Sequence, residues 1–372
     1  MKLTINKADI LDVLSKVQGL TGRRSGLAVT ECVRIKASES SIQIVATDLE
    51  TAYEGNFPAD IQSPGTIAIS ARKLYEIIRE FPSQDILMDQ SENRWINIGN
   101  EKVQYHLVAM NPDDFPEPPI LEITDFFAIE TADLKKMIEK STIISGIGED
   151  KKPHINGVWL EYLKERQPPL IWMASTDGSR LSKYEIASDP QQKPPTNEGV
   201  LVPKKGLHEV SKFLEPGETI KIGIQGSYFV LKSETETFCI RMLEGKFPSY
   251  DEIIERQDGY KIVIEKERFL KMVKRMSILC TDTYRAAIFT FNDDRLIINA
   301  TNPDIGESKE EMNIDYKGDK IEVAFNPRFF IDAANGIEDQ KLELNVVSEE
   351  KACLITGVED KSYISAIMPM RV

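Results

Sequence analysis

The chain has 372 residues, a net charge of −14 and four cysteines. This length allows two or three domains, each large enough to bury its own core. No run of about 18 apolar residues occurs, and residues 1–7 lack the apolar stretch of a signal peptide, so we expect no membrane span. The acidic balance argues against a nucleic acid partner unless basic residues are segregated on one surface.

A strand-then-helix pattern occurs three times along the chain. It begins at residues 2–11, returns at 127–136 and occurs last at 261–270, each time as alternating apolar residues followed by apolar residues three and four positions apart. A second pattern of the same kind follows in each copy. The sequence therefore predicts six helices, two in each copy, over residues 7–18, 71–80, 131–141, 203–214, 265–276 and 326–337.

Strand-like segments follow every predicted helix, and a tripeptide recurs among them at Ala46–Asp48, Ser175–Asp177 and Ala300–Asn302. Each copy is predicted to hold two β-α-β-β-β units, which makes the fold class α+β. An aromatic–proline pair closes each of the first two copies, and Met368–Pro369 stands at the matching place in the third. We expect three repeated domains, over residues 1–120, 121–252 and 253–372.

The charge is unevenly distributed between the predicted helices and the rest of the chain. The six helical segments sum to a positive charge, which leaves a more strongly acidic body. If helices about 9–10 Å apart line one wall, six close a circle with almost no hole, whereas twelve leave an opening of about 26 Å. A duplex is about 20 Å across, so two chains could surround it. Weak positive charge inside such a ring would permit sliding.

Catalytic and metal-binding patterns are scarce. The chain has three histidines, His106 in the first copy and His154 and His208 in the second, and none has a partner at metal-ligand spacing. The chain contains no Cys-x-x-Cys, phosphate-binding loop or Gly-x-Ser-x-Gly elbow. The cysteines are far apart, which indicates buried reduced thiols and a cytoplasmic protein. A hydrolase centred on Ser179 is one alternative, although the matching turns in the other copies lack the serine.

Several short motifs carry a resemblance that covers the full length of the chain. They are Ala71–Lys73, Asn156–Gly157, Thr176–Leu181, Gly245–Tyr250, Phe325–Asn326 and Met368–Val372. With these motifs the chain resembles the DNA polymerase III beta subunit family, the bacterial sliding clamps. The resemblance implies three domains of the DNA clamp fold in a head-to-tail dimeric ring, with helices lining the hole. It implies an accessory subunit without enzymatic activity or cofactor.

The resemblance also implies the partners. They are double-stranded DNA held without sequence preference, a second copy of the chain, the replicative polymerase, a clamp-loader ATPase and other proteins with a clamp-binding motif. No membrane is implied. The remaining alternative is a protein-interaction scaffold that uses the C-terminal pocket but does not bind DNA.

In this family, a groove between the second and third domains takes a short peptide from each partner. The matching positions here form an apolar floor with turn residues beside it. They are Ile155, Thr176, Gly178, Ser179, Arg180, Leu181, Pro248, Ile253, Asn326, Ile367, Met368, Pro369, Met370, Arg371 and Val372. Three positions depart from the family pattern and bear on peptide preference, namely Ser179, Glu252 and Tyr284.

Basic helix residues and one loop are the candidate DNA contacts. Arg24 and Arg72 match family contact positions, and the loop with Glu149, Pro153 and His154 matches a contact region. Helix-borne candidates by charge alone are Lys73, Lys204, Lys205, Lys271, Lys274 and Arg275.

Apolar residues at the two ends of the repeat are the candidate dimer contacts. The resemblance places Tyr105 and Leu107 on the first-domain side of the interface, and Ile278 and Leu279 on the third-domain side. Apolar residues are expected there, because the ring must stay closed in dilute solution.

Overall fold

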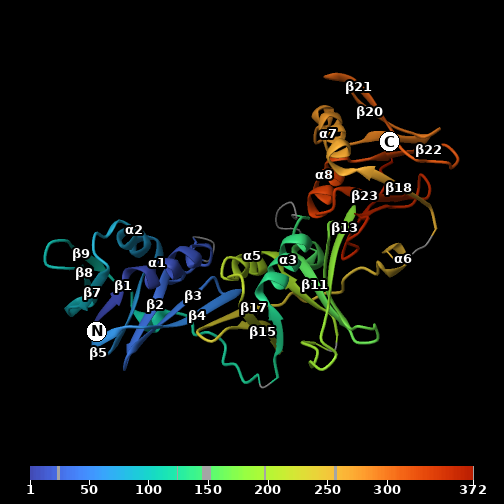
Figure 1. Ribbon diagram of the computed structural model, residues 1–372. Coiled ribbons are helices and arrows are strands. Elements are labelled where there is room, and N and C mark those ends of the chain that lie inside the picture. The colour runs from blue at the N-terminus through green and yellow to red at the C-terminus, as the bar shows by residue number, and fades with distance from the viewer. Residues whose placement is uncertain (23–25, 124, 145–151, 197, 255–257, 372) are drawn as a thin grey trace. The chain divides into compact units, whose positions relative to one another are not determined.

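The computed structural model describes residues 1–372 except 23–25, 124, 145–151, 197, 255–257 and 372. Arg24, Glu149 and Val372 therefore lie outside the described residues. The chain forms two compact units (Figure 1). Unit 1 comprises residues 1–135, 191–197 and 202–243, and unit 2 comprises residues 136–190, 198–201 and 244–372.

Unit 1 holds two antiparallel sheets. The first has the strand order β5-β1-β7-β8-β9 and the second β10-β15-β16-β17-β4-β3-β2-β6. The strands of the first sheet are β1 (Lys2–Asn6), β5 (Asp60–Ser63), β7 (Asp85–Gln90), β8 (Trp95–Gly99) and β9 (Gln104–Val108). Those of the second are β2 (Cys32–Ser38), β3 (Ser41–Thr47), β4 (Thr51–Pro58), β6 (Gly65–Ser70), β10 (Phe127–Glu130), β15 (Thr219–Gln225), β16 (Tyr228–Lys232) and β17 (Glu236–Arg241).

Unit 2 repeats this plan. Its large sheet has the order β14-β11-β12-β13-β25-β24-β23-β18, and its small sheet has the order β21-β20-β19-β22. The large-sheet strands are β11 (Gly157–Leu163), β12 (Leu170–Thr176), β13 (Arg180–Ala187), β14 (Val200–Pro203), β18 (Tyr260–Glu265), β23 (Lys341–Val346), β24 (Cys353–Gly357) and β25 (Tyr363–Ile367). The small-sheet strands are β19 (Ala287–Asn292), β20 (Arg295–Asn302), β21 (Gly306–Asn313) and β22 (Ile321–Phe325).

The six predicted helices are confirmed. They are α1 (Lys7–Lys16), α2 (Ala71–Glu80), α3 (Thr131–Ser141), α5 (Lys204–Ser211), α7 (Lys266–Met276) and α8 (Pro327–Gly336). Two short helices, α4 (Pro153–Asn156) and α6 (Asp251–Ile254), were not predicted. Helix α5 ends before the predicted residue 214, because the Lys212 N–H bonds back in a tight turn to Glu209 and Val210, ahead of Pro216.

Apolar spacing and end caps explain why these segments are helical. In α7 the buried residues Phe269, Met272, Val273 and Met276 fall on one face. The Asn6 side chain accepts a hydrogen bond from the N–H of Ala8 at the start of α1. Helix α1 packs on α2, and α7 packs on α8, so each helix pair shares one apolar layer over its sheets.

The repeat predicted along the chain is visible in the order of the elements. Each copy runs β-α-β-β-β twice, from β1 to β9, from β10 to β17 and from β18 to β25, with the short β5 added in the first. Strand pairing joins the copies, since β4 pairs with β17 and β13 pairs with β25. The domain boundaries after residues 120 and 252 stay a prediction.

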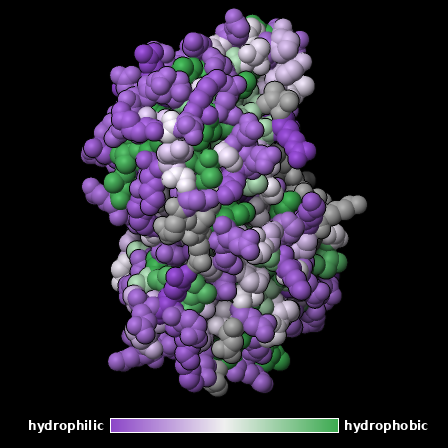
Figure 2. Space-filling view, turned by 90° about the vertical axis from the view of Figure 1, so that its right-hand side faces the viewer, coloured by the Kyte–Doolittle hydropathy of each residue, from purple (hydrophilic) through white to green (hydrophobic). Residues whose placement is uncertain are grey.

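Figure 2 shows a face on which polar residues dominate and apolar residues form small, separate groups. No described helix is long and apolar enough to cross a membrane.

Candidate functional site

The tight turn between β12 and β13 forms one wall of the candidate site. The Thr176 hydroxyl donates to the Arg180 carbonyl oxygen at 2.6 Å and accepts from the Gly178 N–H at 3.0 Å. Asp177 Oδ1 accepts from the N–H groups of Ser179 and Arg180. Gly178 has a φ of +86°, a conformation that L residues with a Cβ adopt rarely. The side chains of Thr176 and Asp177 thus hold the shape of this turn through hydrogen bonds to its backbone.

Arg180 is the most constrained side chain of the site. It is only 9% exposed, and its Nε donates to Asp177 Oδ2 at 2.9 Å. Its Nη1 donates to Asp332 Oδ2 at 2.5 Å, and its guanidinium lies 4.3 Å from the ring centroid of Phe329. Two carboxylates and one aromatic face therefore compensate a charge that would be costly to bury alone.

The C-terminal segment passes along the same turn. Ile367 pairs with Arg180 at the end of the β13–β25 ladder and is fully buried. The next residue, Met368, donates its N–H to the Ser179 carbonyl oxygen at 2.9 Å, and Met370 donates to Ala324 at 2.8 Å. Two backbone bonds therefore hold the tail, while the Met368 side chain is 36% exposed.

A cavity of about 380 Å³ opens beside Arg180. Four of its lining residues were predicted, namely Ile155, Ser179, Arg180 and Asn326. The others are Asp177, Cys280, Thr281, Asp282, Arg285, Arg328, Phe329 and Asp332. Asn326 also caps α8, since its Oδ1 accepts from the Arg328 N–H at 3.0 Å. Its side chain therefore fixes both the wall of the cavity and the start of that helix.

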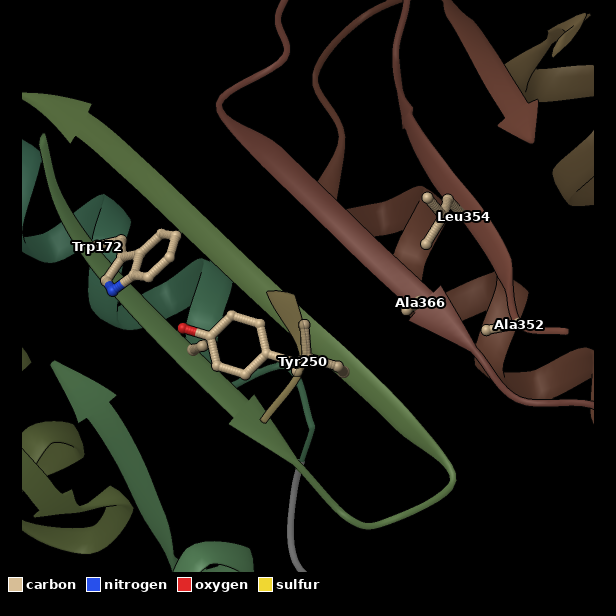
Figure 3. Close-up of a cluster of buried hydrophobic side chains, with 7 residues drawn as sticks. Trp172, Tyr250, Ala352, Leu354 and Ala366 are labelled. Carbon is tan, nitrogen blue, oxygen red and sulfur yellow. The ribbon is translucent and has the colours of Figure 1, made fainter. Parts of the chain in front are cut away.

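An apolar cluster built around Leu181 contains the remaining floor of the site. Leu181 belongs to the same buried cluster as Trp172, Tyr250, Leu354 and Ala366. Figure 3 shows the rings of Trp172 and Tyr250 next to one another, with centroids 5.7 Å apart. Predicted Ile253 packs against this cluster. By contrast, Pro248 and Arg371 are exposed, and no described contact joins either to the cavity.

The candidate DNA contacts on α2 are exposed and share one carboxylate. Arg72 and Lys73 both bond to Glu76, at 3.1 and 2.8 Å. The Lys73 ammonium, followed by the Arg72 guanidinium, lowers the pKa of the Glu76 carboxyl. The two cations are therefore available at the surface, but their field is partly neutralised by Glu76.

The other predicted DNA contacts have different surroundings. Lys205 is exposed and bonds to Asp48, and Lys204 is half-buried at the start of α5. Pro153 and His154 are half-buried in α4. The structure thus brings no two of these four side chains into a described contact.

Three family models match the chain. They describe the N-terminal, central and C-terminal domains of the DNA polymerase III beta subunit, and they match residues 1–119, 128–249 and 252–371. The chain belongs to the DNA polymerase III beta subunit family. The beta sliding clamp of Caulobacter vibrioides is 25% identical over 375 residues, and that of Pseudomonas aeruginosa is 26% identical over 377 residues; each alignment covers 100% of both chains.

A solved structure of the DNA polymerase III subunit beta from Pseudomonas aeruginosa has a TM-score of 0.92 at 25% identity and covers 100% of both chains. The three clamp domains and the antiparallel α+β architecture are therefore confirmed. This clamp is a replication processivity factor and an accessory subunit, not an enzyme.

Two sheet edges of the clamp carry the predicted dimer residues or lie beside them. Strand β9 is the last strand of its sheet, and it holds Tyr105, which is 37% exposed, and the half-buried Leu107. Strand β21 is the edge of the small sheet in unit 2 and contacts the turn Ser277–Leu279. In that turn Ile278 is 74% exposed and Leu279 is half-buried.

Sequence reasoning missed Asp332, Phe329 and Arg328, which line the clamp's cavity. Asp332 and Phe329 also contact Arg180. Asp332 lies 152 positions from Arg180 in the chain, so no local spacing could have connected them. Asn326 was found because it belongs to a family motif, and the missed residues follow it within two turns of α8.

No group of three potential metal ligands occurs among the residues that the structure describes. Ser179 is exposed, and none of the described residues around the cavity is a histidine that could activate it. The hydrolase alternative therefore has no geometric support in this clamp.

Proposed function

We propose that two copies of this clamp close head to tail into a ring around duplex DNA and tether the replicative polymerase to it. The observation that carries the proposal is the pair of open edges, β9 at the end of the first repeat and β21 in the third. Each edge has an exposed apolar side chain beside it, Tyr105 and Ile278. Pairing β9 of one copy with β21 of the other would cover both edges and both side chains.

The helix charges support loose contact with DNA rather than tight binding. On α7, Lys271 bonds to Glu267 at 2.6 Å, and Arg275 bonds to Glu310 at 2.9 Å. On α2, Glu76 shares its charge between two cations. Each phosphate contact would have to compete with a carboxylate that the protein already holds, which lowers the number of counterions released. Such a surface favours sliding.

We further propose that the cavity beside Arg180, the Leu181 cluster and the tail form the binding site for partner peptides. The cluster offers an apolar surface for an anchoring side chain, and the cavity beside it offers arginine donors and a rigid turn. The replicative polymerase, the clamp loader and other proteins with a clamp-binding motif would compete for this site. We propose a cytoplasmic location, because all four cysteines are free and buried.

Retention on circular DNA tests the ring. Clamp loaded onto a nicked plasmid should stay bound during gel filtration and should be lost after the plasmid is cut by a restriction enzyme. A clamp that stays on linear DNA with free ends would contradict topological binding. An excess of a polymerase-tail peptide, added after loading, should displace the polymerase but leave the loaded clamp on the circle, which separates the two parts of the proposal.

A further inference from the structure

The junction between the first and second repeats reproduces the turn of the candidate partner site. The Thr47 hydroxyl donates to the Thr51 carbonyl oxygen at 2.9 Å, as the Thr176 hydroxyl does to Arg180 at 2.6 Å. In both turns the following aspartate accepts the N–H groups two and three residues on. The two turns therefore have the same local structure.

The strand that crosses from the next repeat is also held in the same way. Arg241, at the end of β17, donates its N–H to the Glu50 carbonyl oxygen at 2.8 Å. Met368, directly after β25, donates to the Ser179 carbonyl oxygen at 2.9 Å. The β4–β17 junction is thus the internal counterpart of the β13–β25 junction, where the partner site lies.

The two junctions differ in the side chains at matching positions. At the β13–β25 junction, Trp172, Leu181 and Tyr250 are large and belong to one buried cluster. Figure 3 shows Trp172 and Tyr250 next to one another. The repeat aligns these positions with Gln43, Ala52 and Pro118. The smaller side chains leave a cavity of about 580 Å³, and all three of them line it. This volume lies within the usual range of ligand sites.

The strands beneath this cavity carry an excess of basic side chains. Arg34 and Lys36 on β2 and Lys232 on β16 line it, opposite one carboxylate, Glu54. Glu54 accepts a hydrogen bond from the Gln43 amide at 3.0 Å. Neither Lys36 nor Lys232 forms an ion pair with any residue in the described part of the chain. The floor of the cavity is therefore positively charged, although the protein as a whole is acidic.

The linker between the first and second repeats, residues 115–121, places an acidic segment across this basic floor. Phe115 is buried in an apolar cluster at one end, and Leu121 packs on a second cluster at the other. Between these anchors, Glu117 accepts a hydrogen bond from Arg34 Nη1 at 2.5 Å. Asp113, which precedes Phe115, also lines the cavity. The Glu117 side chain is 77% exposed, so the hydrogen bond to Arg34 is its main tie to the floor.

Arg34 has unused capacity for an anion. The residue is 8% exposed, and its Nε has no hydrogen-bond acceptor among the described residues. A guanidinium can hold a carboxylate through two parallel bonds, whereas Glu117 bonds to Nη1 and leaves Nε without an acceptor. A carboxylate presented from the cavity after the linker moves could use both nitrogens.

We propose that this cavity is a second peptide site, which takes an acidic segment of a partner protein in place of Glu117. The likeness of this cavity to the partner site supports the proposal only if the proposed function is correct. The basic side chains that line the cavity support it independently of that function. The linker acts as a built-in competitor, so an incoming peptide must supply at least one carboxylate for Arg34 and others for Lys36 and Lys232.

Fluorescence polarisation of fluorescein-labelled hexaglutamate would test this site on the full chain. We expect saturable binding, with no binding of labelled hexaglutamine. The double variant K36Q/K232Q should weaken binding at least about tenfold, as expected for loss of charge-assisted hydrogen bonds. Both lysines are exposed, so this variant should fold. E117Q should tighten binding, because it frees Arg34 from its competitor.

The matched control is K351Q/K361Q, which removes two exposed lysines of unit 2. Equal weakening by the two double variants would overturn the site, as would hexaglutamate that fails to bind. Sodium glutarate that competes as well as the peptide at equal carboxylate concentration would show a small-anion site and overturn the peptide proposal. Removal of residues 368–372 should leave hexaglutamate binding intact, so a failure here is distinguishable from a failure of the partner site.

Discussion

Arg180 on β13 donates from Nη1 to Oδ2 of Asp332 on α8 at 2.5 Å, which ties the second repeat to the third inside the candidate partner site. The contact is partly exposed, since the Asp332 side chain is 41% exposed while that of Arg180 is 9% exposed. Asp177 holds the opposite side of the same guanidinium. The site is therefore shaped by a charge network whose members come from two repeats.

Asp332→Asn should lower the free energy of unfolding by about 1 kcal/mol, because it removes one charged acceptor from a partly exposed pair. It should also weaken peptide binding, since Arg180 would gain freedom at the cavity wall. Urea denaturation and peptide titration would measure the two effects. Asp282→Asn, in the same cavity but with a side chain 93% exposed, is the control and should change stability little.

Asn326→Ala should cost about 1 kcal/mol through loss of the N-cap of α8, and it should also weaken binding of the partner peptide. Asn6→Ala removes the equivalent cap of α1 and should cost a similar amount without affecting the peptide. Thermal unfolding and peptide titration of both variants would check this. Equal loss of peptide affinity in the two would show that the cap acts only through general stability.

Glu76→Gln should increase the affinity for duplex DNA, because it frees Arg72 and Lys73 from their shared carboxylate. The slope of binding against salt concentration should become steeper by up to about two phosphate contacts. Glu80→Gln makes the same charge change on the same helix but frees Arg79, which is not a candidate contact. Matching slopes for the two variants would argue against Arg72 and Lys73 as DNA contacts.

Glu236 should make the clamp less stable as the pH rises. Burial raises the pKa of its carboxyl, despite the hydrogen bond from Tyr53. A group with a raised folded-state pKa binds its proton more tightly in the folded chain, so its contribution favours folding at low pH and is lost as the pH rises through that pKa. Glu236→Gln should therefore stabilise the clamp near pH 7 relative to the unmodified protein, and the difference should shrink below the ordinary glutamate pKa.

Urea denaturation at several pH values would measure this difference. The Tyr53 hydroxyl can still donate to the oxygen of a glutamine amide, so the hydrogen bond is kept in the variant. A variant that is less stable than the unmodified protein at every pH would mean that the charged carboxylate stabilises the fold.

Ile278→Asp should convert the proposed dimer into monomers, because it places a charge at the apolar contact beside β21. Light scattering at micromolar concentration should give the variant half the particle mass of the unmodified protein. Val263→Asp changes a residue of β18 that is 46% exposed but lies on a different sheet, and it should leave the dimer intact. If the unmodified protein is itself a monomer by light scattering, the proposal of a two-copy ring is contradicted.

The helices were predictable because their signal is local. In α7, four apolar residues recur at the spacing of a single helix face, and Pro327 follows the Asn326 cap at the start of α8. Short elements such as α4 and β5 have too few residues to display a period, so they were missed. The way β4 joins β17 depends on a partner far along the chain, which no local pattern describes.

The candidate site was predicted from the resemblance to a family and not from a local pattern. Arg180 and Leu181 stand inside a motif of that family, whereas Asp332 contributes to the site only through the fold. Charge alone suggested Lys205 as a DNA contact, but the sequence could not show that its ammonium bonds to Asp48. Pairing between oppositely charged surface groups depends on tertiary geometry, which cannot be derived from a count of charged residues along the sequence.

The sharing of one sheet by two repeats also affects how the chain is synthesised. Tyr53 on β4 meets Glu236 only after another 183 residues, which at typical elongation rates takes about 10–40 s. During that interval the hydrogen-bonding edge of β4 has no native partner and is open to pairing with other chains. The nascent first repeat is therefore a candidate client for ribosome-associated chaperones.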